Sequence, residues 1–165
     1  MRFAWKALVF LAFACLPLLV HFVLRDSLGA SAAAGLAHAG AYLLLLWYFA
    51  RTLGAGREPL ITRIARHIHG SVPPDMARFT RAITRAWCAF FAAQILVSAL
   101  LLAFATRDAW SLFVNVLDLP LLALMFAAQQ AYRALRFPLV PPVSVVRIIK
   151  AFAEVTSRDR RTGTL

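Results

Sequence analysis

The sequence predicts an all-α integral membrane protein with four transmembrane helices and both termini in the cytoplasm. The chain of 165 residues is 62% hydrophobic and only 15% charged. A soluble domain of this size could not bury so many apolar side chains in its core. Four apolar spans are each long enough to cross the roughly 30 Å hydrocarbon layer of a bilayer. Nearly all basic residues lie on one side of these spans. We therefore expect one membrane domain covering residues 1–165.

The first span is predicted at residues 7–24. Arg2 and Lys6 before it, and the small residues Ala30-Ser31-Ala32 after it, are also features of a cleaved signal peptide. Its apolar run of 18 residues exceeds the usual apolar region of about 7–15 residues in such peptides. We therefore expect a retained helix.

The second span is predicted at residues 28–50 and is rich in small residues at helical spacing. This spacing lets helices approach closely and predicts tight packing within the chain. It also suits a homo-oligomer. The residues concerned are Gly29, Ala33 and Ala37, together with Gly35 and Ala39.

The third and fourth spans are predicted at residues 86–106 and 109–132. Between spans two and three, the cytoplasmic loop 51–85 has an apolar stripe from Leu60 to Ile68, then a break at 70–74, then a second helix from about Asp75 that runs into span three. The tail 133–165 holds another amphipathic helix, with Ser144 as its N-cap. Basic amphipathic helices of this kind are expected to lie in the membrane surface.

The charge distribution predicts the orientation. Two basic residues precede the first span, seven lie in the loop 51–85 and seven in the tail, whereas the opposite side carries Arg25 and Arg107. The basic side of a membrane protein faces the cytoplasm. Trp47, Trp87 and Trp110 fall near predicted span ends, where the amphipathic indole ring prefers to lie. With the arginine-rich, lysine-poor composition, this predicts a multi-pass protein of the bacterial inner membrane.

One polar layer is predicted inside the membrane. His38 and Asp118 each lie about 14–15 Å from the outer end of their span by helical rise. A buried acid in a span is costly and often functional, so one hypothesis is a His38–Asp118 pair that relays protons or polarises a substrate head group. The alternative is a hydrogen-bond network that fixes the helices. The predicted layer comprises His38, Gln94, Asn115 and Asp118.

Several function classes are disfavoured. The two cysteines, Cys15 and Cys88, lie in apolar spans and show no metal-ligand spacing. His67 and His69 fall on different faces of a helix, so neither a metal nor another cofactor is expected. Catalytic motifs of the common enzyme classes are absent from the sequence, and no catalytic residue is predicted. Because the positive charges flank apolar spans, we expect anionic lipid headgroups or an acidic protein as partners, and no nucleic acid.

A set of short motifs between Leu53 and Pro138 resembles a family of small bacterial inner-membrane proteins. They are Gly56-Arg57-Glu58-Pro59-Leu60-Ile61-Thr62-Arg63, His69-Gly70, Pro73-Pro74, Phe79-Thr80-Arg81, Trp87, the stretch from Asn115 to Pro120, Tyr132-Arg133 and Arg136-Phe137-Pro138. Members of that family are often encoded beside type II fatty-acid-synthase-like genes for aryl polyene pigments. The resemblance implies a membrane accessory to lipid or polyene biosynthesis and offers no catalytic residue to carry over.

The leading functional hypothesis is a membrane accessory or scaffold that recruits an acidic partner, such as acyl carrier protein or a biosynthetic enzyme, to its basic cytoplasmic face. The alternative for the same arginines is binding of anionic lipid alone. A small transporter or flippase using His38 and Asp118, and a membrane enzyme acting on a lipid-linked substrate, are the other hypotheses. The residues predicted to form the partner or lipid surface are Arg57, Glu58, Arg63, Arg66, Arg78, Arg81 and Arg85.

Overall fold

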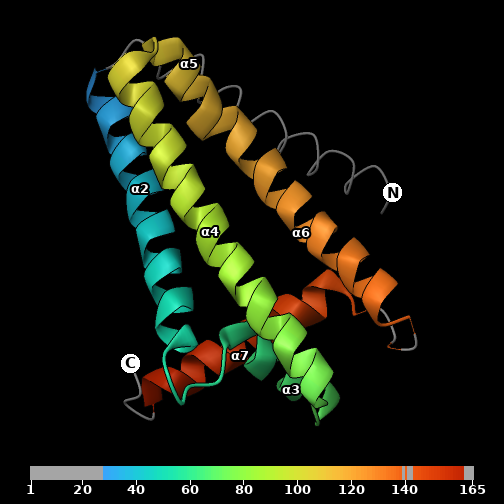
Figure 1. Cartoon of the computed structure of the whole chain (residues 1–165). Helices are drawn as coiled ribbons and strands as arrows, with labels where there is room; N and C mark the ends of the chain where they lie inside the picture. Colours follow the sequence, from blue (N-terminus) through green and yellow to red (C-terminus); the bar gives the residue numbers. More distant parts are fainter. Residues whose placement is uncertain (1–27, 139, 141–142, 162–165) are drawn as a thin grey trace, which may run out of the picture. The chain divides into compact units, whose positions relative to one another are not determined.

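The computed structural model of the chain describes residues 28–161 apart from 139 and 141–142. Within these residues the structure is helical and contains no strand, as predicted (Figure 1). The predicted span 7–24, with its signal-peptide alternative, falls outside the described residues. The helices are α2 (Leu28–Ala50), α3 (Leu60–His69), α4 (Pro74–Phe104), α5 (Arg107–Leu112), α6 (Asp118–Arg136) and α7 (Val145–Arg161).

Helix α4 confirms the predicted continuity between loop and span. It begins at Pro74, where a proline costs nothing because the first amide of a helix has no intrahelical partner, and it continues for 31 residues to Phe104. Helix α3 ends where predicted: Gly70 has a φ of 78° and its amide donates to the carbonyl of Arg66 at 2.8 Å. A left-handed residue of this kind closes a helix, and glycine adopts it without a steric penalty.

Residues 107–136 form a long, nearly continuous helix with one widened turn. Thr106 caps α5 through its side chain, which accepts from the amide of Ala109. A π-turn over Phe113–Leu117 then leads into α6. Pro120 lies just beyond it and lacks the amide hydrogen that would continue the regular bonding pattern, which accounts for an irregular turn at this place.

The described residues belong to two compact units, which are described separately. Unit 1 comprises residues 28–44 and 91–127, and unit 2 comprises residues 45–90 and 128–161. The boundary between them falls within α2, α4 and α6.

In unit 1, Trp110 forms the centre of the packing. Its side chain is buried and its indole N–H donates to the hydroxyl of Ser98 at 3.0 Å. Gly35 of α2 lies directly against the indole ring, so that a Cβ there would come within 2.8 Å of it. The predicted close packing at Gly35 is therefore against Trp110. The indole ring of Trp110 is therefore covered by protein and its polar N–H is satisfied there, while its predicted place at the membrane interface stays a prediction.

In unit 2, Leu60 and Thr84 have no exposed surface. Trp87 is also buried, packs against Phe49 and donates its indole N–H to the side-chain oxygen of Gln129. Its predicted place in an interfacial belt likewise stays a prediction. Trp47 remains exposed, with the guanidinium of Arg51 over its ring at 4.7 Å.

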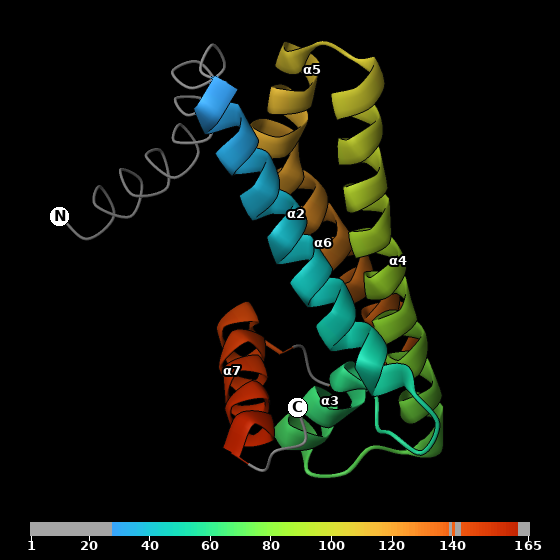
Figure 2. The same ribbon diagram turned by 90° about the vertical axis from the view of Figure 1, so that its left-hand side faces the viewer.

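Helices α3 and α7 pack side by side within unit 2 (Figures 1 and 2). Both are amphipathic, as predicted, and Ser144 caps α7 by accepting from the amide of Arg147 at 3.3 Å. Leu60 and Ile64 of α3 are buried inside the unit. The expectation that α3 turns this stripe toward a membrane surface is therefore wrong, because protein side chains already cover it.

Candidate functional site

An open groove in unit 2 brings together most of the predicted partner surface. Two segments line it, 56–66 from the start of α3 and 77–81 from the first turns of α4. It contains five of the seven predicted residues, namely Arg57, Glu58, Arg66, Arg78 and Arg81. We call this surface the arginine groove.

Backbone contacts hold the two sides of the arginine groove together. The guanidinium of Arg81 donates to the carbonyl of Arg57 at 3.2 Å, and that of Arg57 donates to the carbonyl of Arg51 at 3.3 Å. Thr52 positions the start of helix α3. Its buried hydroxyl accepts a hydrogen bond from the backbone amide of Leu60, the first residue of the helix, at 3.0 Å. The groove is thus shaped by hydrogen bonds that also satisfy the end of a helix.

Two acids pair with two of the four arginines. Glu58 accepts from Arg66 through both Nε, at 2.9 Å, and Nη2, at 2.7 Å. Asp75 accepts from Arg78. The groove therefore retains an excess of positive charge, and because its side chains are largely solvent-accessible, its attraction for anions depends on salt.

The remaining two predicted residues lie elsewhere. Arg63 is half-buried and does not line the groove. Arg85 is exposed on α4, one helical turn beyond Arg81, and does not line it either. Arg85 is therefore a natural comparison residue for experiments on the groove.

A second polar site lies in unit 1, where His38 and Asp118 meet as predicted. The Nε2 atom of His38 is 3.4 Å from Oδ1 of Asp118, without the geometry of a hydrogen bond. The hydroxyl of Tyr42 donates to the same oxygen at 2.6 Å, and the rings of His38 and Tyr42 lie 4.7 Å apart. Tyr42 was not predicted, although it lies one helical turn from His38 and therefore on the same face of α2.

The other two members of the predicted polar layer behave differently. Asn115 donates to Ser111 at 3.0 Å within the π-turn region. Gln94 is buried, and its amide nitrogen has no hydrogen-bond partner among the described residues. The same holds for both ring nitrogens of His38. The side chains of His38 and Gln94 are thus buried with nitrogens that have no hydrogen-bond partner in the described part of unit 1, and such groups lower the stability of the fold.

The side chains of His38, Tyr42 and Asp118 in unit 1 can bind and transfer protons. A carboxylate, a phenol and an imidazole can share or pass protons. In the part of the chain that the structure describes, no group of three His, Cys, Asp or Glu side chains is placed to hold a metal ion.

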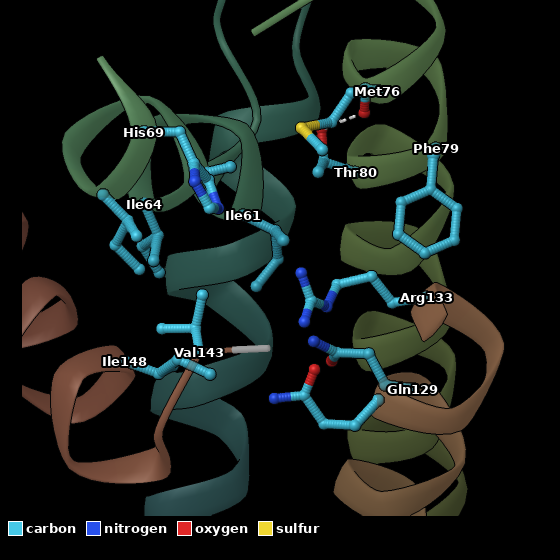
Figure 3. Close-up of a pocket in the computed structure, with 13 residues that line it drawn as sticks. Ile61, Ile64, His69, Met76, Phe79, Thr80, Gln129, Arg133, Val143 and Ile148 are labelled. Carbon is cyan, nitrogen blue, oxygen red and sulfur yellow. Dashed lines mark hydrogen bonds between the residues drawn. The ribbon is translucent and has the colours of Figure 1, made fainter. Parts of the chain in front are cut away.

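A pocket in unit 2 was missed by sequence reasoning. It is lined by side chains from α3, α4, α6 and α7 (Figure 3), and Gln129 and Arg133 extend into it from α6. Its members lie far apart in the sequence, so no local motif could have indicated it.

The class of protein is defined by its helices: among the residues that the structure describes, two helices, Pro74–Phe104 and Arg107–Arg136, are long and apolar enough to cross a membrane. No family model, curated protein or solved structure matches the chain. The resemblance to small bacterial membrane proteins therefore stays a prediction, carried by the motifs between Leu53 and Pro138.

Proposed function

We propose that the chain is a multi-pass protein of the bacterial inner membrane with four spans and cytoplasmic termini. The exposure of its apolar helices supports this. In the two candidate spans, only 17% and 11% of the most apolar window is buried within the protein, whereas a core helix of a soluble protein would be mostly covered. Leu36, Leu102 and Leu124 are each more than 60% exposed. A bilayer removes this surface from water.

Helix α2 supports a further span. Its 23 residues contain no Asp, Glu, Lys or Arg, and at 1.5 Å per residue its length is about 34 Å. That is enough to cross the hydrocarbon layer.

We further propose that this membrane protein is a scaffold or accessory factor that docks an acidic protein at its cytoplasmic face. The observation that carries the proposal is the convergence of Arg57, Arg66, Arg78 and Arg81 in one groove. Charge complementarity of this kind steers and orients an acidic partner. The family resemblance supplies the partner class, acyl carrier protein of a lipid or polyene biosynthetic system.

The test measures binding of purified acyl carrier protein to the full-length chain in nanodiscs of neutral phosphatidylcholine. We expect Arg78→Ala with Arg81→Ala to weaken binding about tenfold or more, in line with loss of two close charge contacts. The matched control pairs Arg85→Ala with Arg136→Ala, which removes the same charge outside the groove.

Equal losses in the groove variant and the control would show a diffuse charge effect and contradict a docking groove. Nanodiscs with phosphatidylglycerol test the lipid alternative. If the carrier protein does not bind and the groove variant instead loses affinity for vesicles of this anionic lipid, the arginines serve lipid binding.

A transporter is a second candidate, favoured by Asp118 together with the nitrogens of His38 and Gln94 that have no hydrogen-bond partner among the described residues. Buried titratable groups of this kind mark proton or substrate paths in membrane helices. Asp118→Asn and Asp118→Leu should then both abolish function in cells at normal protein levels. Normal function of both variants would leave Asp118 a structural residue.

A further inference from the structure

The pocket between α3, α4, α6 and α7 is an apolar cavity with polar groups at its edge. Its walls are chiefly aliphatic and aromatic, from Ile61, Ile64, Ile68, Met76, Phe79 and Ile148. The cavity volume is about 80 Å³, several times the roughly 10–15 Å³ that one water molecule needs. Water gains few hydrogen bonds against such walls, so an apolar occupant is favoured there.

Polar side chains line the pocket beside these apolar walls. Figure 3 shows Arg133 and Gln129 extending from α6 toward α3, with His69 on the α3 side. Gln129 is held by Trp87, whose indole N–H donates to its side-chain oxygen. An apolar cavity with a guanidinium and a carboxamide beside it matches an occupant with a hydrocarbon body and an anionic end.

The local electrostatics agree with an anionic end. Partial burial, followed by the positive charges of Arg133 and then Arg147, holds the pKa of His69 below its ordinary value. Arg147 also donates to the carbonyl of Ile68 at the end of α3. The field around His69 therefore disfavours a further cation and favours an anion.

We propose that this pocket binds the carboxyl end of one fatty acid, with the first carbons of its chain between α3, α4 and α7, its carboxylate at Arg133 and the rest of the chain outside the cavity. The cavity of about 80 Å³ is smaller than the roughly 150 Å³ of an apolar cavity that binds benzene, so it takes only a few carbons of a single chain. This site is distinct from the arginine groove, since Arg133 does not line the groove and Arg81 does not line the pocket. The proposal goes beyond docking of a carrier protein and does not depend on it.

The test uses the full-length chain in phosphatidylcholine nanodiscs with two probes, palmitate and hexadecanol, which differ in the anionic end. We expect wild-type protein to bind palmitate about tenfold more tightly than hexadecanol, since a charge-assisted hydrogen bond contributes on that order. Arg133→Gln should remove this preference, and Arg136→Gln, an exposed control on the same helix, should keep it. Ile61→Trp should block both probes by filling the pocket, whereas Leu135→Trp on the exposed side of α6 should block neither.

Photocrosslinking provides a readout that needs no variant. A diazirine analogue of palmitate should label Ile68, Met76 or Phe79 in the wild-type protein. Equal affinity for palmitate and hexadecanol would overturn the proposal, as would equal losses in Arg133→Gln and Arg136→Gln. Labelling confined to the exposed apolar faces of α2, α4 and α6 would also overturn it. Failure of carrier-protein docking with normal palmitate binding would reject the proposed function and leave this site standing.

Discussion

Two threonine hydroxyls show how single residues join the helices of unit 2. Thr62 of α3 and Thr80 of α4 are both buried, and their hydroxyl oxygens lie 2.7 Å apart. The hydroxyl of Thr80 also lies within hydrogen-bond distance of the carbonyl of Met76, at 2.9 Å, and either threonine can be the donor between the two hydroxyls. This pair connects two sides of the chain that line the arginine groove.

We predict strong coupling between these two threonines. Thr80→Val leaves the buried hydroxyl of Thr62 without its hydrogen-bond partner and should lower the free energy of unfolding by about 1–3 kcal/mol. Replacing both threonines should lower it by less than the sum of the two single changes. A double-mutant cycle by thermal or denaturant unfolding in detergent should give a coupling energy of about 0.5–1.5 kcal/mol. Strictly additive losses would show that the hydroxyl pair does not act as a unit.

Gly35 and Gly40 are two glycines of α2 with different surroundings, so that substitutions at the two positions can be compared. A Cβ at Gly35 would come within 2.8 Å of Trp110, while a Cβ at Gly40 meets nothing within 4 Å. Gly40→Ala should therefore be neutral or stabilising, since alanine is favoured over glycine in helices by up to about 1 kcal/mol. Gly35→Ala should lower the melting temperature, because the indole of Trp110 is buried and hydrogen-bonded and cannot move away without loss. Equal melting temperatures for the two variants would contradict the packing of Trp110 on α2.

The pKa of His69 predicts a dependence of stability on pH. Because the folded-state pKa lies below the ordinary value near 6.5, the unfolded chain takes up the proton first as the pH falls. The free energy of unfolding should therefore decrease between about pH 7 and pH 5. The effect should be small because His69 is exposed, and it should shrink further in His69→Gln. A steeper decline in that variant than in wild type would contradict this sign.

At the scale of elements, α7 is held to unit 2 by few but specific contacts. Ala151 and Val155 are buried, the hydroxyl of Tyr48 donates to Thr156 at 3.2 Å, and His67 lies 2.6 Å from Glu154. The apolar residues Val146 and Ile149 are more than 60% exposed. The helix therefore has one face against α3 and another that is open.

We predict that Val155→Asp releases α7 and that Val146→Asp does not. A buried unpaired carboxylate is costly, whereas the same group at an exposed position is solvated. Hydrogen exchange of the α7 amides should speed up strongly in the first variant and remain near wild type in the second. Fast exchange in wild-type α7 would itself refute stable packing of this helix.

The helix boundaries show which local sequence signals were sufficient to predict where helices begin and end. The helix over 28–50, the continuous entry into α4, the end of α3 at Gly70 and the cap at Ser144 all follow from helical periodicity and from proline, glycine and serine preferences. The π-turn before Asp118 was not predicted: Pro120 interrupts the regular bonding pattern there, but where the widened turn forms also depends on how the helix fits its neighbours. The face of α3 was misassigned for a similar reason: an amphipathic stripe fits a protein core as well as a membrane surface.

At the scale of the whole chain, the placement of positive charge is the main predictor of topology. Fourteen basic residues lie in the loop 51–85 and the tail, and Arg107 lies between the third and fourth predicted spans. In a background with Cys15 and Cys88 replaced by serine, Arg107→Cys should react with a membrane-impermeant thiol reagent in spheroplasts, and Arg66→Cys should react after lysis. Labelling of Arg66→Cys in intact spheroplasts would reject the proposed orientation.

The sequence by itself determined the helical class, the apolar spans and the segregation of charge, because these depend on residue composition, local periodicity and transfer of side chains between water and lipid. It also indicated the residues of both polar sites, since a buried acid and clustered arginines are unusual wherever they lie. The tertiary structure decided which of them meet: Tyr42 joins His38 and Asp118, Arg57 and Arg66 face Arg78 and Arg81, and Arg133 reaches a pocket that no local pattern marks. Contacts between residues far apart in the chain depend on how helices pack, and packing is a property of the folded molecule rather than of any segment.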